Sequence, residues 1–222
     1  MEGLGGLEAR LEALRRRIAA SSPAPERVRL VAVTKGLGVE AAVAARRVGL
    51  ADLGENYASE LAAKASALGD PGARWHFLGA IQRRQVRRVA GVVSLWHSVA
   101  RLEEGREISK RSPEAEVLVQ VAFGSLPGRN GCPPEEAEGL VKALGRLGLR
   151  VLGLMTVAPP GGEAAARRAF SSLAALGRGL GLPELSMGMS DDLEVALEEG
   201  ATMVRVGRAL FGERPTPGGR RE

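Results

Sequence analysis

The chain has 222 residues, a formal net charge of +5, 45% hydrophobic residues and 26% charged residues. These values fit one globular domain with a full core and exclude a largely disordered chain. No apolar run approaches the 18 or more residues of a membrane span, and the amino terminus is charged and amphipathic rather than signal-like, so we expect no membrane association. Cys132 is the single cysteine, which excludes an intramolecular disulfide and favours a reducing, cytoplasmic location.

Helix-like and strand-like segments alternate along the sequence. Leu7, Leu11, Leu14 and Ile18 recur at helical spacing, so the chain opens with an amphipathic helix. Short apolar segments of strand character follow at residues 29–34, 52–53, 75–78, 92–96, 117–121, 151–155, 185–186 and 203–205. Helix-like segments come between or after them at residues 39–48, 57–68, 82–89, 99–111, 135–147, 163–180 and 193–198, with a short helical piece after Gly207.

Eight alternations of strand and helix predict parallel βα units and an α/β fold. The number favours closure into a (β/α)8 TIM-type barrel over an open doubly wound sheet. No G-x-G-x-x-G motif follows the first strand, which argues against dinucleotide binding. We therefore expect a single barrel domain over residues 1–214 with an extra N-terminal helix, and a disordered tail at residues 215–222.

Lys35 is one of only four lysines and directly follows the first predicted strand. Lys64, Lys110 and Lys142 lie in polar, helix-like segments, so we expect them to be solvated. A desolvated lysine has a lowered pKa, and its neutral amine can form a Schiff base with an aldehyde or ketone. The alternative is a lysine at a strand end whose ammonium group extends to solvent.

Two loops near the end of the chain have the composition of an anion site. Residues 186–190 (Ser-Met-Gly-Met-Ser) precede Asp191-Asp192 at a predicted helix start, and Gly207 precedes Arg208 in a similar turn. These loops follow strands seven and eight, where phosphate commonly binds in TIM-type barrels. Together with Lys35 they predict a site for a phosphorylated aldehyde, either pyridoxal phosphate or an aldol-type sugar phosphate.

Arg205 lies on the last strand and would direct a cation at the ligand ring. Arginine does not deprotonate, so beside a pyridine nitrogen it would disfavour the pyridinium form and weaken the ring as an electron sink. The alternative is an ion pair with a carboxylate at the barrel end.

The densest positive charge is the segment Arg83-Arg84-Gln85-Val86-Arg87-Arg88. No aromatic residues interleave it for base stacking, so we interpret it as a solvated helix face or a local anion site and expect no nucleic-acid binding. The two histidines, His76 and His97, lie on separate elements, and we expect no metal site.

The segment LSMGMSDDLEVALEEGATMVRVGRALFG, with VAVTKG, GENYASE, WHFLGAIQ and LGLMTVAPP in the same order, resembles the pyridoxal phosphate homeostasis protein family. That family is similar to the barrel domain of alanine racemases. The resemblance implies pyridoxal phosphate held as an internal aldimine on Lys35, with Asn56 nearby and Arg205 facing the pyridine nitrogen. It also implies phosphate contacts from Ser186, Ser190 and Gly207 with its neighbour Arg208. We add His76, at the third strand, to the expected cofactor-binding residues.

Position 208 departs from the family pattern, which has a threonine there. Arg208 could pair with the phosphate or point away from it. Gly36-Leu37-Gly38 and Arg84-Gln85 also replace residues that are usual in the family, lysines among them.

The resemblance implies a cofactor carrier without established turnover, with apo enzymes and free amino acids as exchange partners, and we expect a monomer. The alternative is a racemase-like enzyme of low activity. Racemisation needs an acid/base group on each face of the substrate α-carbon, and the sole tyrosine, Tyr57, starts a peripheral helix. A Schiff-base aldolase is a third hypothesis.

Overall fold

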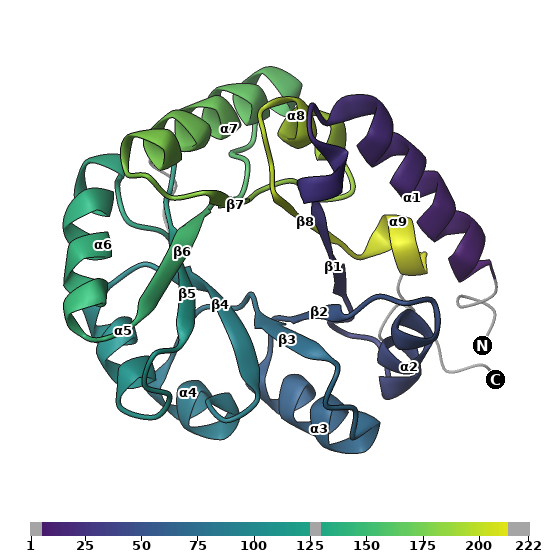
Figure 1. Ribbon diagram of the computed structural model, residues 1–222, viewed down its shortest axis with the longest axis horizontal. Helices are drawn as coiled ribbons and strands as arrows, with labels where there is room; N and C mark the ends of the chain where they lie inside the picture. The colour runs from purple at the N-terminus through teal and green to yellow at the C-terminus, as the bar shows by residue number, and fades with distance from the viewer. Residues whose placement is uncertain (1–5, 125–129, 213–222) are drawn as a thin grey trace, which may run out of the picture.

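The computed structural model describes residues 6–124 and 130–212. Eight parallel strands pair in sequence order and close into a barrel, with the last strand beside the first (Figure 1). They are β1 (Arg29–Val33), β2 (Asp52–Glu55), β3 (Arg74–Phe77), β4 (Val93–Val99), β5 (Glu116–Gln120), β6 (Arg150–Met155), β7 (Glu184–Ser186) and β8 (Met203–Val206). The predicted TIM-type barrel is confirmed.

Helices surround this barrel. They are α1 (Leu7–Ser21), α2 (Val39–Arg47), α3 (Ala58–Leu68), α4 (Arg83–Val89), α5 (Leu102–Ser109), α6 (Ala137–Arg146), α7 (Gly162–Gly179), α8 (Leu193–Glu198) and α9 (Arg208–Phe211), with single 3-10 turns at Pro25–Arg27 and Pro134–Glu136. Of the described helices, none is long and apolar enough to cross a membrane.

The expected extra helix α1 lies against α8 and α9, on the outside of the β8–β1 junction (Figure 1). Its buried leucines are those of the predicted apolar face. Two side chains attach it to the end of the barrel: Arg17 Nε lies 2.6 Å from Glu194 Oε1, and Arg10 Nε donates to the carbonyl of Leu210 at 2.7 Å. The helix therefore joins the first and last parts of the chain.

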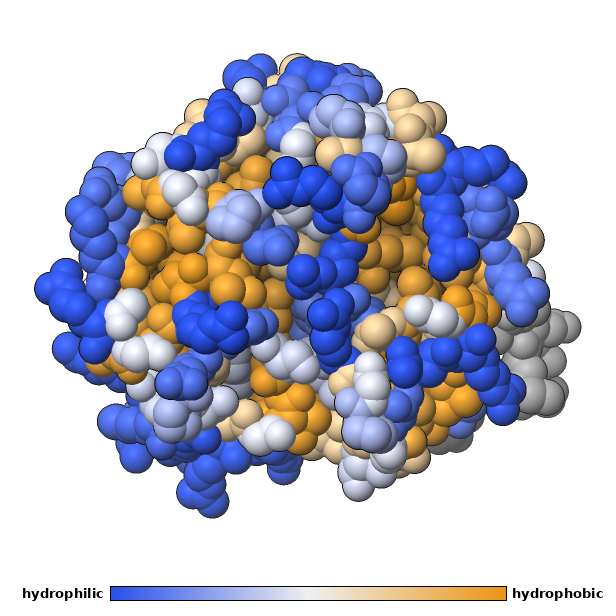
Figure 2. All heavy atoms as spheres, in the orientation of Figure 1, coloured by the Kyte–Doolittle hydropathy of each residue, from blue (hydrophilic) through white to orange (hydrophobic). Residues whose placement is uncertain are grey.

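The main apolar core lies between the strands and the surrounding helices, where Trp96, Phe77 and Phe170 are fully buried. In the orientation of Figure 1, the apolar residues visible on this face lie between hydrophilic side chains around its edge and further hydrophilic side chains near its centre (Figure 2). Inside the barrel a second, small cluster joins Leu95, Leu118, Met155 and Met203. Neighbouring residues of one strand can therefore belong to different clusters, as Leu95 lies in the inner cluster and Trp96 in the main core.

The fourth strand is longer than the sequence suggests. The expected strand at residues 92–96 continues to Val99, so Val99 is a strand residue and not the start of a helix, which begins at Leu102. His97 and Ser98 both find buried hydrogen-bond partners, which lets polar residues continue a buried strand. The expected domain end at residue 214 and the tail at 215–222 lie outside the described residues.

Candidate functional site

A small cavity of about 170 Å³ opens where β1, β2, β3, β6 and β8 end. Lys35, Asn56, Ser190, Arg205, Gly207 and Arg208 all line it, so the structure brings together six of the eight expected site residues. The remaining lining comes from Val33, Leu78, Met155, Val157, Met189 and Asp191. The cavity lies at the carboxyl ends of the strands, where working groups of such barrels are found.

The backbone on both sides of Lys35 is fixed by side chains of α3. Lys64 Nζ donates to the carbonyl of Thr34 at 2.7 Å, and the amide of Gly36 donates to Glu60 Oε2 at 2.7 Å. The expectation that Lys64 is solvated was wrong, because its side chain is only 6% exposed. Its helix turns this residue toward the barrel, and the ammonium group finds acceptors there.

Glu55 is the reason that Lys64 can be buried. This fully buried carboxylate accepts from Lys64 Nζ at 2.5 Å and from the hydroxyl of Thr34 at 2.6 Å. Its other oxygen, Oε2, has no partner among the described residues. Burial raises the pKa of Glu55 above its usual range, although Lys64 and Thr34 both act to lower it. A buried ion pair therefore lies directly beneath the segment that carries Lys35.

Asn56 is positioned by the loop that follows β3. A Cβ on Gly79 would come within 1.9 Å of the Asn56 carbonyl oxygen, so only glycine allows the two loops to approach this closely.

Arg205 places a buried cation at the cavity. Its Nη1 donates to the Ser186 hydroxyl at 2.7 Å and its Nη2 to the carbonyl of Thr156 at 2.8 Å. The alternative of an ion pair with a barrel-end carboxylate is not observed within the described part of the chain. Burial lowers the pKa of Arg205 to about 10, which still leaves it protonated at neutral pH. Its charge is therefore held by neutral acceptors.

A chain of hydrogen bonds continues from Arg205 through the barrel interior. The Ser186 hydroxyl lies 2.9 Å from His97 Nδ1, His97 Nε2 lies 2.8 Å from His76 Nδ1, and His76 Nε2 lies 2.8 Å from Asp52 Oδ1. His76 and Ser186 thus lie beneath the cavity and are not among the residues that line it. The sequence predicted the two histidines on separate elements. These elements are the paired strands β3 and β4, which bring His76 and His97 together.

Electrostatics fix the direction of this chain. Burial lowers the pKa of His76, and burial together with the nearby His76 and Arg205 lowers that of His97 much further, so both imidazoles are neutral at pH 7. Burial acts to raise the pKa of Asp52, but hydrogen bonds from His76 and Arg74 outweigh it and keep the carboxylate ionised. Since an ionised Asp52 only accepts, each group donates toward it, from Arg205 through Ser186 and His97 to His76.

The loops after β7 and β8 form the other side of the cavity. Ser190 Oγ accepts from the amide of Ala209 at 3.2 Å, which ties the two loops together. The guanidinium of Arg208 pairs with the carboxylate of Asp191, and both side chains are at least half exposed. Sequence reasoning selected Arg208 but not its acidic partner, because Asp191 was interpreted only as part of a helix start.

No group of three or more His, Cys, Asp and Glu side chains in the described residues is arranged to hold a metal ion. His76, His97 and Asp52 instead use their polar atoms on one another and on Ser186.

Comparison with known proteins identifies the family. Residues 5–215 match the family model for the alanine racemase N-terminal domain. A pyridoxal phosphate homeostasis protein of Pseudomonas aeruginosa is 42% identical over 198 residues, covering 86% of each chain. The chain belongs to this family. A second member, from Deinococcus radiodurans, is 39% identical over 190 residues, 83% of this chain and 88% of the relative.

A solved structure is also similar to most of this chain. PipY of Synechococcus elongatus, with pyridoxal phosphate bound, superposes with a TM-score of 0.80 at 31% identity and covers 93% of this chain and 100% of its own.

Proposed function

We propose that this protein binds pyridoxal 5'-phosphate through Lys35 and acts as a homeostasis protein that stores and releases the cofactor without catalytic turnover. Two comparisons support this: the relatives at 39–42% identity are named pyridoxal phosphate homeostasis proteins, and the PipY structure contains pyridoxal phosphate. The single structural observation that carries the proposal is Lys35 and the buried Arg205 lining one small cavity at the barrel mouth.

The residues present fit the cofactor. The cavity offers an amine for an aldehyde, a buried guanidinium for a ring nitrogen, and a loop pair with hydroxyl and cationic groups for a phosphate. The apolar side chains of Val33, Leu78 and Met155 line it as well and give a flat ring an apolar environment. Arg205 lacks a carboxylate partner among the described residues, so an acceptor atom of a ligand would add to the hydrogen bonds of a buried cation.

Each residue then has a distinct part. When bound, pyridoxal phosphate supplies an aldehyde that condenses with amines. Lys35 supplies the amine, held in place by the fixed backbone of Thr34 and Gly36. Ser190, Gly207 and Arg208 would hold the phosphate, and Asn56 would lie beside the ring.

Arg205 would donate to the ring nitrogen and keep it unprotonated. The chain from Ser186 through His97 and His76 to Asp52 holds Arg205 in the orientation that it needs. His76 and Ser186 therefore act as positioning residues. Because an unprotonated ring is a weak electron sink, this arrangement favours retention of the cofactor over carbanion chemistry.

The geometry favours carriage over racemisation for a second reason. A racemase needs a second acid/base group opposite the lysine. Tyr57 caps α3, is 56% exposed and does not line the cavity, and the lining Asp191 is paired with Arg208. We further propose a cytoplasmic monomer that exchanges the cofactor with apo enzymes and free amino acids.

Reduction with borohydride tests the assignment. Protein incubated with pyridoxal phosphate, reduced and digested should carry the label on the Lys35 peptide, and Lys35→Ala should lose both label and visible absorption. Lys110→Ala is the matched control, because Lys110 is 67% exposed and its one ion pair among the described residues is with Glu107. A label on Lys64, Lys110 or Lys142 would refute the assignment. If the protein loaded with pyridoxal phosphate racemises an amino acid, and Lys35→Ala abolishes this activity, the protein is a racemase-like enzyme and not a carrier.

A further inference from the structure

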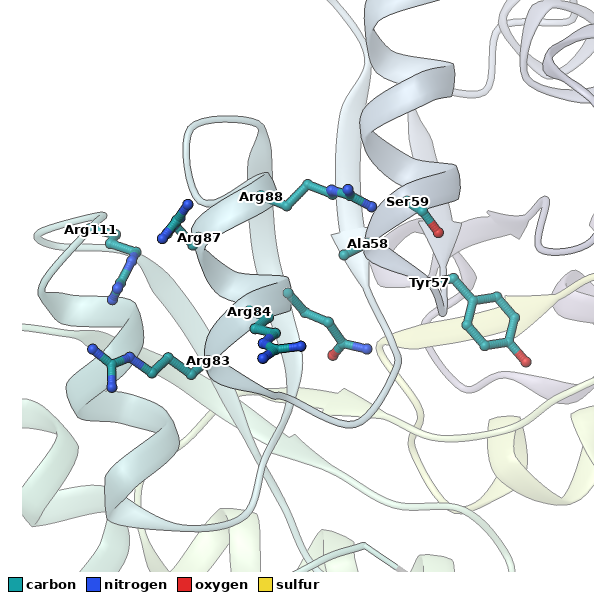
Figure 3. Close-up of a pocket in the computed structure, with 9 residues that line it drawn as sticks. Tyr57, Ala58, Ser59, Arg83, Arg84, Arg87, Arg88 and Arg111 are labelled. Atoms are coloured by element: carbon teal, nitrogen blue, oxygen red, sulfur yellow. The ribbon is translucent and has the colours of Figure 1, made fainter.

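A second cavity, of about 840 Å³, lies around α4 between the start of α3 and the end of α5 (Figure 3). Five arginines line it: Arg83, Arg84, Arg87, Arg88 and Arg111. Arg88 extends from α4 toward Ser59, whereas Arg83 and Arg87 lie on the side that faces Arg111. None of the described residues that line this cavity is acidic. We call it the arginine cavity.

Its positive charge is not balanced by acidic side chains of residues 6–124 and 130–212. Arg84, Arg87 and Arg88 form no ion pair or side-chain hydrogen bond with any described residue. Arg83 and Arg111 both approach a single carboxylate, that of Glu107, which Lys110 also approaches. Other helices behave differently: Arg16, Lys142 and Arg167 each pair with a glutamate four residues earlier. α4 has no acidic residue at all.

This arrangement costs the folded protein stability. Arg83 and Arg87, and likewise Arg84 and Arg88, are four residues apart, a spacing at which like charges on a helix repel. The helix dipole does not change this balance, because it disfavours Arg83 and Arg84 in the first turn and favours Arg87 and Arg88 in the last turn. No acidic side chain within α4 offsets this repulsion, which points to an anionic partner that relieves it.

The arginine cavity adjoins the mouth of the barrel. Tyr57, which lines it, directly follows Asn56, which lines the Lys35 cavity. Tyr57 is 56% exposed, one of the few large apolar side chains at the surface. Tyrosine and arginine are the residue types enriched at protein–protein interfaces and at their energetic centres.

We propose that the arginine cavity is a docking surface for an acidic segment of a partner protein, a segment that presents several carboxylates. Charge complementarity and the exposed Tyr57 favour such a segment over nucleic acid, for which one aromatic side chain provides little base stacking. The docked segment lies beside the entrance to the Lys35 cavity. That the partner is a recipient of the cofactor rests on the proposed function, whereas the docking itself does not.

A labelled short poly-L-glutamate peptide, followed by fluorescence anisotropy with the full chain, tests the proposal. The test variant is Arg84→Gln/Arg87→Gln/Arg88→Gln. The control variant is Arg47→Gln/Arg168→Gln/Arg178→Gln, which removes three exposed arginines whose side chains form no ion pair among the described residues. Both lower the formal net charge from +5 by three, to +2. Any difference between them therefore reports position and not total charge.

We expect the test variant to bind poly-glutamate about tenfold more weakly, the combined worth of three exposed ion pairs, and the control to change it less than about twofold. Binding by the wild type should weaken as salt rises. The test variant should fold at least as well as the wild type, as seen by thermal unfolding, because it relieves repulsion within α4.

Equal weakening by both variants, or by neither, would overturn the proposal. Displacement of the peptide from the wild-type protein by a duplex oligonucleotide is measured as well. If the oligonucleotide displaces the peptide and binds more tightly than it does, and its binding is weakened about tenfold in the test variant, the cavity is a nucleic-acid site instead. Pyridoxal phosphate absorption, measured on the same samples, should be unchanged in the test variant. A chain that fails to bind the cofactor but still binds poly-glutamate would refute the proposed function alone.

Discussion

Replacing Lys64 by methionine tests the buried ion pair beneath the Lys35 segment. The substitution keeps the length of the side chain but removes the donor to Glu55 Oε1 and to the carbonyl of Thr34. Glu55 is fully buried and its Oε2 already lacks a partner among the described residues, so the Thr34 hydroxyl would be the one hydrogen-bond donor left to its carboxylate within the described part of the chain. We expect it to take up a proton in the folded variant.

The cost follows from that proton. With an ordinary pKa of 4.5 in the unfolded chain, protonating Glu55 at pH 7 costs about 3.4 kcal/mol, at about 1.36 kcal/mol per pH unit. The loss of the hydrogen bond from Lys64 Nζ to the carbonyl of Thr34 adds about 1 kcal/mol. The free energy of unfolding should therefore fall by roughly 4 kcal/mol, and Tm by about 8–16 °C.

The sign of the pH dependence makes this prediction specific. Because the folded pKa of Glu55 is raised further in Lys64→Met, the variant recovers stability as the pH falls toward 4.5 and loses it as the pH rises. At pH 5 the proton should cost only about 0.7 kcal/mol. Urea unfolding at both pH values measures the difference.

Two further variants serve as controls. Lys142→Met removes an exposed pair with Glu138 and should change stability by less than about 0.5 kcal/mol. Glu55→Gln added to Lys64→Met should abolish the pH dependence. A Lys64→Met protein within about 1 kcal/mol of the wild type at pH 7, with no dependence on pH, would show that Glu55 and Lys64 are not a coupled buried pair.

Three other predictions concern the site. Arg208→Thr should weaken pyridoxal phosphate binding up to about fivefold in an absorption titration, because it removes a cation that would hold the phosphate and leaves the Asp191 carboxylate unpaired beside it. Adding Asp191→Asn should restore part of the binding, and tighter binding by the single variant would contradict this. His97 has a folded pKa far below 6.5, so its contribution to stability is present above pH 6.5 and is lost as the pH falls. The free energy of unfolding of the wild type, measured in urea, should therefore fall between pH 7 and pH 5.5, and His97→Gln should reduce this fall by about 1.3 kcal/mol. An unchanged pH profile would refute the buried neutral state of His97. Gly79→Ala should lower Tm and cofactor retention, since its Cβ meets the Asn56 carbonyl, whereas Gly91→Ala, where a Cβ meets open space, should not.

The alternating segments of the sequence determined the fold. Local periodicity identifies strands and helices, and eight parallel βα units close into a barrel whose strand ends carry Lys35, Arg205 and Gly207. Strand length was harder to predict, because His97 and Ser98 are polar residues whose buried partners come from other strands and loops. The local sequence around His97 and Ser98 contains no information about partners that are distant along the chain.

The tertiary structure alone decided which charges are buried. Lys64 has the sequence surroundings of a solvated helix residue, yet it is buried because Glu55 and Thr34 lie where α3 meets the barrel. From the sequence Asp191 was interpreted only as part of a helix start, and the folded chain shows it paired with Arg208 of the loop after β8. In each case the cost of burying or unpairing a charge depends on a partner many residues away, and only the folded chain brings that partner within hydrogen-bonding distance.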